Sequence, residues 1–596
     1  MAAISTRHHI AVSGGRGHEA PGSTDALPAA GAPGEASAAP SSPWPARHPL
    51  LVVALTSAFV AILQSVWIWQ HRHAGALDPD EAGYIATAFR YHRIIGSDLL
   101  ALPRAIGGTA NGPLIPLLSV PLLWFGPLDP RTVLLMQPIL LVVGAVAVGG
   151  IANRLAGAGA AVVSGTVFVL LPTVVFASQT YWFGLGAAAF LACALWAMLA
   201  SERFTNRWTY AVGLGVGAML LSRTMTVGYL PAVAGCGLVL AGRDRRSLLG
   251  LVKAGLTTVV VAGPWWFVAW DSAYNYLFTY GYGKRAGLFG HNDLHSRFDD
   301  RVGRIRDGLG PAGTWAEVVL VCAVIVLVLT WKGWPRSTRP ALALAVGGAL
   351  GFAALLSTAN NGVWFELPLL VILVPLAVSV GAAAPWWVRL PAVVPVAVAG
   401  CLQLACALWW IAPGTRPVPT VAVNHRVSQY EYGFEQYDTR FGPTQRSHLV
   451  TASRDWASLS RRVESYLWDA RRQQTKVFTM SGSFELFNTN TVQLVAEERG
   501  WTAPLWTPDT YGTSATRKQF LTPIARDDKG TVVTDRQGRP VERILVLAIH
   551  HQHLFTPDAN VLDLYREALA AGWHAVARFA IPRGGYVYVL RHAASG

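Results

Sequence analysis

Apolar residues are concentrated between Leu50 and Pro413, in runs of about 20 residues, the length that a helix needs to cross the hydrocarbon core of a bilayer. The runs are joined by short polar segments. By this measure the pattern predicts about eleven spanning helices. They are expected at 50–70, 132–152, 159–178, 182–200, 208–222, 225–241, 249–270, 313–331, 341–358, 363–381 and 391–411. Residues 48–413 are therefore expected to form an α-helical polytopic membrane domain.

Two long polar segments, 70–131 and 271–312, interrupt this pattern and are expected to be outer loops. Long loops in a compact fold are usually functional or disordered. These two hold most of the charge of the membrane half, which favours function. The first also contains an apolar run, 113–126, that has three prolines and is too short to span, so we expect an interfacial or re-entrant helix there.

The two ends of the chain have different patterns. Residues 1–47 are rich in Ala, Gly, Pro and Ser and have few large apolar groups, which predicts a disordered tail. Residues 414–596 predict a soluble α/β domain. Its expected elements are strands at 476–480 and 543–549, a helix at 561–571, and a hairpin of 574–581 with 586–591.

Composition supports a membrane protein and adds an orientation. Of 596 residues, 52% are hydrophobic and 14% charged, whereas about 25% would be charged in an ordinary soluble enzyme. The net charge of +14 is carried largely by basic residues in short loops on one side, which the positive-inside rule assigns to the cytoplasm. These are Arg47, Arg154, Arg203, Arg207, Arg243, Arg245, Arg246, Lys332, Arg336, Arg339 and Arg389. The N-terminal tail is therefore expected inside and residues 414–596 outside. Abundant Ala, Gly and Arg with little Lys indicates a GC-rich bacterial genome, and hence the inner (plasma) membrane.

The densest acidic cluster follows the first span, where Asp78, Asp80 and Glu81 lie within four residues at the start of an amphipathic helix, 81–93. Asp is a common N-cap, so a purely structural role is open. Charge close to the hydrocarbon boundary is, however, costly and usually functional. A carboxylate here could act as a general base or hold a divalent cation.

Candidate cations lie in the outer segments, and Arg223 is the most informative because apolar helices flank it. An isolated arginine there is costly unless it is paired, although it could also reach the interface by extending its side chain. Asp78, Asp80, His291 and Asp293 are possible metal ligands. For His291 and Asp293, the plainer interpretation is a polar loop tip. Tyrosines at 274–282 are typical of membrane-interface anchors. The aromatic residues Trp501, Trp506 and Tyr511 could form either a carbohydrate-stacking face or a core.

The order of these features resembles the C-type-fold integral-membrane glycosyltransferases, in particular the branch of protein O-mannosyltransferases and lipid A aminoarabinose transferases. Three motifs carry the resemblance. Residues 80–84 (DEAGY) are similar to the Asp-Glu-x-x-Tyr motif, 111–114 (NGPL) to a Pro-Leu stretch, and 263–266 (GPWW) to a proline-aromatic element at the outer end of a span. In the aminoarabinose branch, basic residues lie within the first motif and before the Pro-Leu stretch, whereas this chain has Gly83 and Asn111.

The resemblance implies transfer of a sugar from a polyprenyl-phosphate donor to a hydroxyl of an envelope glycan, lipid or protein at the outer face, with inversion. Asp80 would be the general base, and Glu81 would support it or bind the acceptor. A phosphate leaving group needs positive charge. The residues expected to supply it are Arg104, Arg223, Lys284 and Arg285. Tyr84, Asn111, Tyr282 and His291 are expected to contact substrate. No cofactor is certain from the resemblance, and a divalent cation is possible.

Other functions stay open at this stage. A transporter or flippase of envelope precursors is the main alternative, but we find no internal repeat of the kind that transporters often carry. A sensor or scaffold would not need about eleven spans to anchor one domain. An oligosaccharyltransferase would carry a Trp-Trp-Asp-Tyr-Gly-type motif, and none follows Pro413.

Overall fold

The structure, a computed structural model, describes a membrane part and a C-terminal part, which is called the outer part after the side on which the sequence predicts it. In the membrane part it describes residues 48–72, 77, 79–283, 286, 291–305, 309, 338–360, 365–383, 386–408 and 410. In the outer part it describes 437–438, 442–443, 446–473, 476–481, 487–501, 505–506, 520–526, 531–534, 538–549, 558–582 and 584–593.

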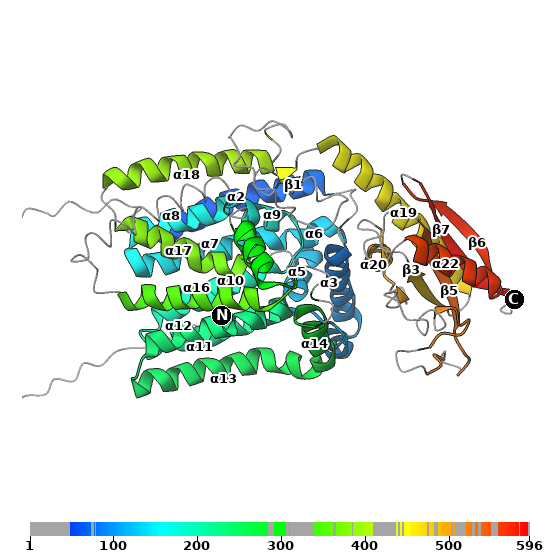
Figure 1. Ribbon diagram of the computed structural model, residues 1–596, viewed down its shortest axis with the longest axis horizontal. Helices are drawn as coiled ribbons and strands as arrows, with labels where there is room; N and C mark the ends of the chain where they lie inside the picture. Colours follow the sequence, from blue (N-terminus) through cyan, green and yellow to red (C-terminus); the bar gives the residue numbers. More distant parts are fainter. Residues whose placement is uncertain are drawn as a thin grey trace, which may run out of the picture. The chain divides into compact units, whose positions relative to one another are not determined.

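The membrane part is a bundle of apolar helices, most of which run side by side in Figure 1. They are α2 (Pro49–His71), α7 (Met136–Ala156), α8 (Ala158–Leu170), α9 (Pro172–Gln179), α10 (Gly184–Ala200), α11 (Trp208–Ser222), α12 (Leu230–Ala241), α13 (Arg245–Val268), α16 (Thr338–Ser357), α17 (Leu367–Ala382) and α18 (Trp386–Ala407). Five described helices, or six counting one bent pair, are long and apolar enough to cross a membrane. The expected span at 313–331 lies outside the described residues, and the other expected spans coincide with helices.

One expected span is broken. Residues 159–178 form two helices, α8 and α9, which meet at an angle of 57°. The break lies at Leu171, whose extended backbone (φ −62°, ψ 132°) precedes Pro172. A residue before proline is pushed out of the helical region, and proline itself cannot donate a helical hydrogen bond, so a continuous helix is disfavoured at this point.

Small residues allow the helices to approach closely. A Cβ at Gly213 of α11 would lie 2.4 Å from the carbonyl oxygen of Ala254 in α13. A Cβ at Gly150 of α7 would lie 2.5 Å from the indole of Trp196 in α10. Helix association in lipid depends on such packing because burial of apolar side chains gives little driving force there.

The first outer segment contains several short helices. They are α3 (Pro79–Ser97), the 3₁₀ turn η1 (Leu99–Ala101), α4 (Leu102–Gly107), α5 (Leu114–Phe125) and α6 (Pro130–Leu134). The expected short apolar helix is α5, which has 12 residues, with Pro121 inside it. In Figure 1, α3 runs across the direction of the long helices.

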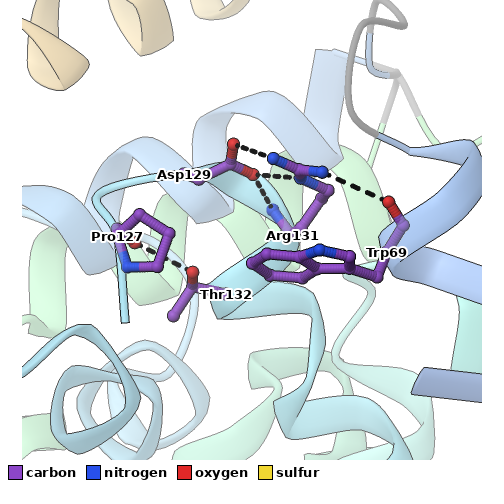
Figure 2. Close-up of polar contacts among 5 residues, drawn as sticks. All are labelled: Trp69, Pro127, Asp129, Arg131 and Thr132. Atoms are coloured by element: carbon purple, nitrogen blue, oxygen red, sulfur yellow. Dashed lines mark hydrogen bonds and ion pairs between the residues drawn. The ribbon is translucent and has the colours of Figure 1, made fainter. Parts of the chain in front are cut away.

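Figure 2 shows how the end of this segment is attached to the first span. Asp129 accepts hydrogen bonds from the Arg131 backbone N at 2.8 Å and from its Nε at 2.9 Å. The same guanidinium donates to the Trp69 carbonyl at 3.2 Å and lies 4.3 Å from the centre of the Trp69 ring. The start of α6 is therefore fixed to the outer end of α2.

The second outer segment begins directly after α13. It contains α14 (Trp270–Tyr276) and the π-helical turn η3 (Leu277–Gly281), and a further turn, η2 (Thr224–Tyr229), joins α11 to α12. Tyr280, in η3, accepts a hydrogen bond through its carbonyl from Asn360 Nδ2 at 2.7 Å. This bond ties the segment to the residues that follow α16.

The outer part is an α/β unit. Its five-stranded sheet has the order β4-β3-β5-β7-β6, in which β3 is parallel to β4 and β5, and β7 is antiparallel to β5 and β6. The strands are β3 (Lys476–Ser481), β4 (Leu505–Trp506), β5 (Glu542–Ile549), β6 (Trp573–Ala580) and β7 (Tyr586–His592). A separate two-stranded ladder pairs β1 (Tyr437–Asp438) with β2 (Gly442–Pro443).

Helices cover both faces of this sheet, which explains the apolar run of β5. Ile544 and Val546 pack with α19 (Arg446–Gln473) and α20 (Thr489–Glu498), whereas Leu545 and Leu547 pack with α22 (Asp558–Ala570). The α/β class, both expected strands, the helix and the hairpin are confirmed. Trp501 belongs to the core, where its Nε1 donates to Glu464 at 2.9 Å. Residues 507–519 and 550–557 lie outside the described residues, and with them Tyr511.

Candidate functional site

The site starts at the N-terminus of α3, where the two acidic residues have different surroundings. Asp80 is open to solvent. Glu81 is fully buried, accepts a hydrogen bond from Arg72 at 2.5 Å, and accepts another from the backbone N of Tyr181 at 2.8 Å. Glu81 therefore ties the first turn of α3 to the outer end of α2 and to the segment before α10. Of the two carboxylates, Asp80 is the one that a substrate can reach.

Tyr84 and Asn111, two predicted substrate contacts, lie side by side. Asn111 Nδ2 donates to the Tyr84 hydroxyl at 3.2 Å. The Tyr84 ring stacks on Phe183, with 3.9 Å between the ring centres. One turn of helix separates Tyr84 from Asp80, so the two side chains leave the same face of α3.

The segment that carries Asn111 is packed tightly against the end of α11. Thr224 Oγ1 donates to the Ala110 carbonyl at 2.5 Å. A Cβ at Gly112 would lie 2.0 Å from the Leu221 carbonyl oxygen, so only glycine fits at position 112. These contacts bring Asn111 next to the turn that carries Arg223.

Arg223 terminates α11 and is only 6% exposed. Its guanidinium carbon lies 4.3 Å from the centre of the Phe365 ring. Although the Asp80 side chain is exposed, protein packs around its base, and this partial removal from water raises the pKa of the carboxyl above its usual value, whereas the positive charge of Arg223 lowers it. Arg223 can change the pKa of Asp80 only if the two side chains are near each other. The fold therefore brings an accessible carboxylate near a buried cation.

Tyr276, at the end of α14, completes this group. Burial raises the pKa of Tyr276 to about 12, and Arg223, Asp80 and a hydrogen bond with Asn111 also act on it. From the sequence, the tyrosines of this segment are expected mainly to be membrane anchors. No spacing in the sequence distinguishes Tyr276 from its neighbours, since its position depends on how α14 packs.

Arg223 also lines a pocket of about 490 Å³, counted with the open space at its mouth. Its lining is mostly apolar and also includes Tyr282, a predicted substrate contact. A second arginine, Arg301, lies 6.0 Å from the centre of the Phe365 ring and donates to the Asn360 carbonyl at 2.5 Å. Burial lowers the pKa of Arg301 to about 10. The sequence analysis did not select Arg301, because it is one of several charges in its segment.

The other predicted residues are not brought to this site by any contact among the described residues. Arg104 is exposed on α4, and His291 and Asp293 are exposed in the second outer segment. Asp293 accepts a hydrogen bond from the Ser296 backbone N at 2.7 Å, which is a helix-capping contact. Lys284, Arg285 and Asp78 lie outside the described residues. Within the described part of the chain, no three His, Cys, Asp or Glu side chains gather as a metal site.

The outer part reaches α3 through α20. Glu497 is fully buried and pairs with Arg90 Nε at 3.1 Å and with Arg93 Nη2 at 2.6 Å. Near the other end of the contact, a Cβ at Gly83 would lie 3.0 Å from the amide nitrogen of Asn490. The helix that carries Asp80 is therefore packed directly against the outer part. The sequence gives no signal for this contact, since its partners lie some 400 positions apart.

Comparison with solved structures identifies the fold. ArnT from Cupriavidus metallidurans, bound to undecaprenyl phosphate, aligns with a TM-score of 0.54 and 15% identity over 91% of this chain and 98% of ArnT. The arabinofuranosyltransferase AftD from mycobacteria aligns with a TM-score of 0.52 and 14% identity over 91% of this chain and 40% of AftD. The chain has the C-type glycosyltransferase fold.

The predicted fold resemblance is thus confirmed. No family model matches the chain, and no curated protein does. Within the C-type fold of this chain, Tyr84 contacts Asn111, Asp80 lies one helical turn before Tyr84, and the charge of Arg223 acts on Asp80.

Proposed function

We propose that the protein is a glycosyltransferase that moves a sugar from a polyprenyl-phosphate donor to a hydroxyl of an envelope glycan, lipid or protein, with inversion at the anomeric carbon. The observation that carries this proposal is an exposed carboxylate, Asp80, close enough to the buried Arg223 for the charge of that arginine to act on it. The first can take a proton, and the second can stabilise a phosphate. The C-type fold supports the class of reaction, since its relatives include ArnT bound to undecaprenyl phosphate.

In the proposed reaction the acceptor hydroxyl oxygen attacks the anomeric carbon of the donor sugar. The new glycosidic bond forms as the bond from the anomeric carbon to the phosphate oxygen breaks. Asp80 takes the hydroxyl proton, and the lipid phosphate leaves with the bonding electrons. A raised pKa makes Asp80 a stronger base than a carboxylate in water, as long as it is ionised at the working pH.

Arg223 is the proposed phosphate ligand. Its charge would stabilise the negative charge that develops on the departing phosphate, in surroundings where water is largely excluded. The mostly apolar lining of the adjacent pocket suits the first isoprene units of a lipid carrier. Tyr282 and Phe365 line the same pocket, and Arg301 lies beyond the Phe365 ring.

Glu81 has a positioning role in this proposal. Its two hydrogen bonds hold the first turn of α3 against Arg72 and Tyr181, which fixes the backbone from which Asp80 extends. Tyr84 and Asn111 are placed to contact the sugar. Arg104, Lys284, Arg285, His291 and a divalent cation at Asp78, Asp80, His291 and Asp293 stay predictions from the sequence.

The proposed location is the bacterial inner membrane, with the N-terminus in the cytoplasm and the outer part on the opposite side. The distribution of basic residues among short loops supports this orientation. Under it, α3 and the Asp80 site lie at the outer face, where a lipid-linked donor would have been delivered.

The proposal is tested by incubating the purified protein in liposomes with a panel of radiolabelled polyprenyl-phosphate sugars and a membrane extract as acceptor. We expect one donor to be consumed, with label in the acceptor fraction and free polyprenyl phosphate in equal amount. If no donor is ever cleaved, the proposal is wrong. Movement of an intact donor across the liposome membrane without cleavage would instead support the transporter alternative.

A further inference from the structure

Gly83 lies three positions after Asp80 in α3, so the two positions are neighbours on the helix surface. Residues three and four positions apart on a helix are neighbours, with about 5–6 Å between their Cβ atoms. The amide of Asn490 fills the space that a side chain at position 83 would occupy, with its nitrogen 3.0 Å from the Cβ position. An amide of the outer part is therefore placed within one helical turn of the position that carries Asp80.

Two contacts set the direction in which α20 approaches α3. Asn490 meets Gly83, and seven residues later Glu497 pairs with Arg90, which is seven residues after Gly83. Seven residues are about two turns, or roughly 10.5 Å of helix. The two helices therefore run side by side in the same direction, and the N-terminus of α20 lies at the Asp80 end of α3.

The N-terminus of α20 is well ordered by its own cap. Asn488 Oδ1 accepts hydrogen bonds from the backbone N of Asn490 at 2.9 Å and of Thr491 at 3.1 Å. The Thr491 hydroxyl accepts in return from the Asn488 backbone N at 2.9 Å. At the other end of the contact, Glu497 is held by two arginines of α3. The Asn490 side chain thus extends from a fixed backbone.

We propose that Asn490 binds the acceptor and makes the outer part a wall of the acceptor site. This inference rests on the proposed function and extends it. A side-chain amide offers two N–H donors and one carbonyl acceptor, which suits the hydroxyl groups of a hydroxyl-rich acceptor. The acceptor class is therefore a hydroxyl-rich glycan.

The test measures the KM for the donor and the KM for the acceptor separately. It uses the donor that the wild type consumes and the membrane extract as acceptor. In Asn490→Ala we expect the apparent KM for the acceptor extract to rise tenfold or more, with the KM for the donor within twofold of wild type. Gly83→Ala should change the acceptor KM in the same direction by a smaller factor, because the new Cβ displaces the amide. Asn490→Gln, which keeps the amide, should recover part of the loss.

Gly96→Ala is the matched control, because Gly96 lies in the same helix with nothing within 4 Å of its Cβ position. It should leave both KM values unchanged. Equal changes in both KM values for Asn490→Ala, or no change in either, would overturn the inference. If the wild type cleaves no donor, the proposed function itself is wrong. If the wild type cleaves donor but Asn490→Ala keeps the wild-type KM for the acceptor, only the inference about Asn490 is wrong.

Discussion

The guanidinium of Arg223 lies over the ring of Phe365, with 4.3 Å between the guanidinium carbon and the ring centre. A planar guanidinium can stack on this ring and still present N–H groups to a phosphate, whereas a lysine ammonium is a compact point charge. The pairing therefore explains why an arginine can be kept in a mostly apolar pocket. It also gives the donor side of the site a specific geometry that substitution can test.

We expect Arg223→Lys to raise the KM for the donor about tenfold, because the charge is kept and the stacking is lost. The measurement is a donor saturation curve at fixed acceptor. Arg154→Lys, at the exposed end of α7, is the control and should behave as wild type. An unchanged donor KM in Arg223→Lys would show that the stacked guanidinium does not hold the phosphate.

The pH dependence of the reaction tests the effect of Arg223 on Asp80. Arg223 lowers the pKa of Asp80, so removing its charge in Arg223→Gln should raise that pKa further. Asp80 would then stay protonated up to a higher pH, and the acid limb of the kcat/KM profile should move to higher pH. A limb that stays in place, or moves to lower pH, would contradict the assignment of Asp80 as the titrating base.

Gly112 provides a test of how the site is assembled. We expect Gly112→Ala to destabilise the protein by about 1–3 kcal/mol, because the Leu221 carbonyl lies in the backbone and cannot move aside easily. Gly108→Ala is the matched control, since its nearest neighbour would be 3.7 Å away, at ordinary contact distance. Thermal unfolding in detergent measures both. Equal stability of the two variants would mean that the 109–112 segment is not packed against α11 as described.

The end of α20 should make stability depend on pH. Burial, aided by Asp129, raises the pKa of Glu498 to about 7, so the folded protein favours its neutral form. Such a group contributes stability at pH values below its ordinary pKa, and this contribution is lost as pH rises through 7. Glu498→Gln should therefore match wild type near pH 4.5 and melt at higher temperature above pH 7.

Melting curves from pH 4.5 to 8.5 test this expectation. Glu567→Gln, an exposed position on α22, is the control and should show no pH-dependent gain. A difference between Glu498→Gln and wild type that is the same at every pH would mean that burial of a charge at position 498 is not its cause.

Much of the fold could be predicted from patterns that depend on near neighbours. The apolar runs predict the membrane helices, and the composition of residues 543–549 predicts a strand, which is β5. The break between α8 and α9 was missed, although Pro172 is its visible cause. Proline within an apolar run can either kink a spanning helix or break it, and packing by neighbouring helices decides which.

The site was predictable where its residues share one helix and not where distant segments meet. Asp80 and Tyr84 are one helical turn apart, so the sequence could pair them. The contacts of Arg223 with Phe365 and of Gly83 with Asn490 join residues far apart in the chain. The burial of Glu81 could not be predicted for the same reason. Glu81 is next to Asp80 in the sequence, but its contacts, Arg72 and Tyr181, come from other segments.

The most direct test of the account is transfer by Asp80→Asn, measured as label that moves from the polyprenyl-phosphate sugar to acceptor. We predict a loss of kcat of about 10²–10⁴-fold, as for removal of a general base, with donor KM little changed. Asp98→Asn makes the same chemical change just after α3, at an exposed residue without a side-chain capping bond, and should retain wild-type transfer. Full transfer by Asp80→Asn would contradict the account.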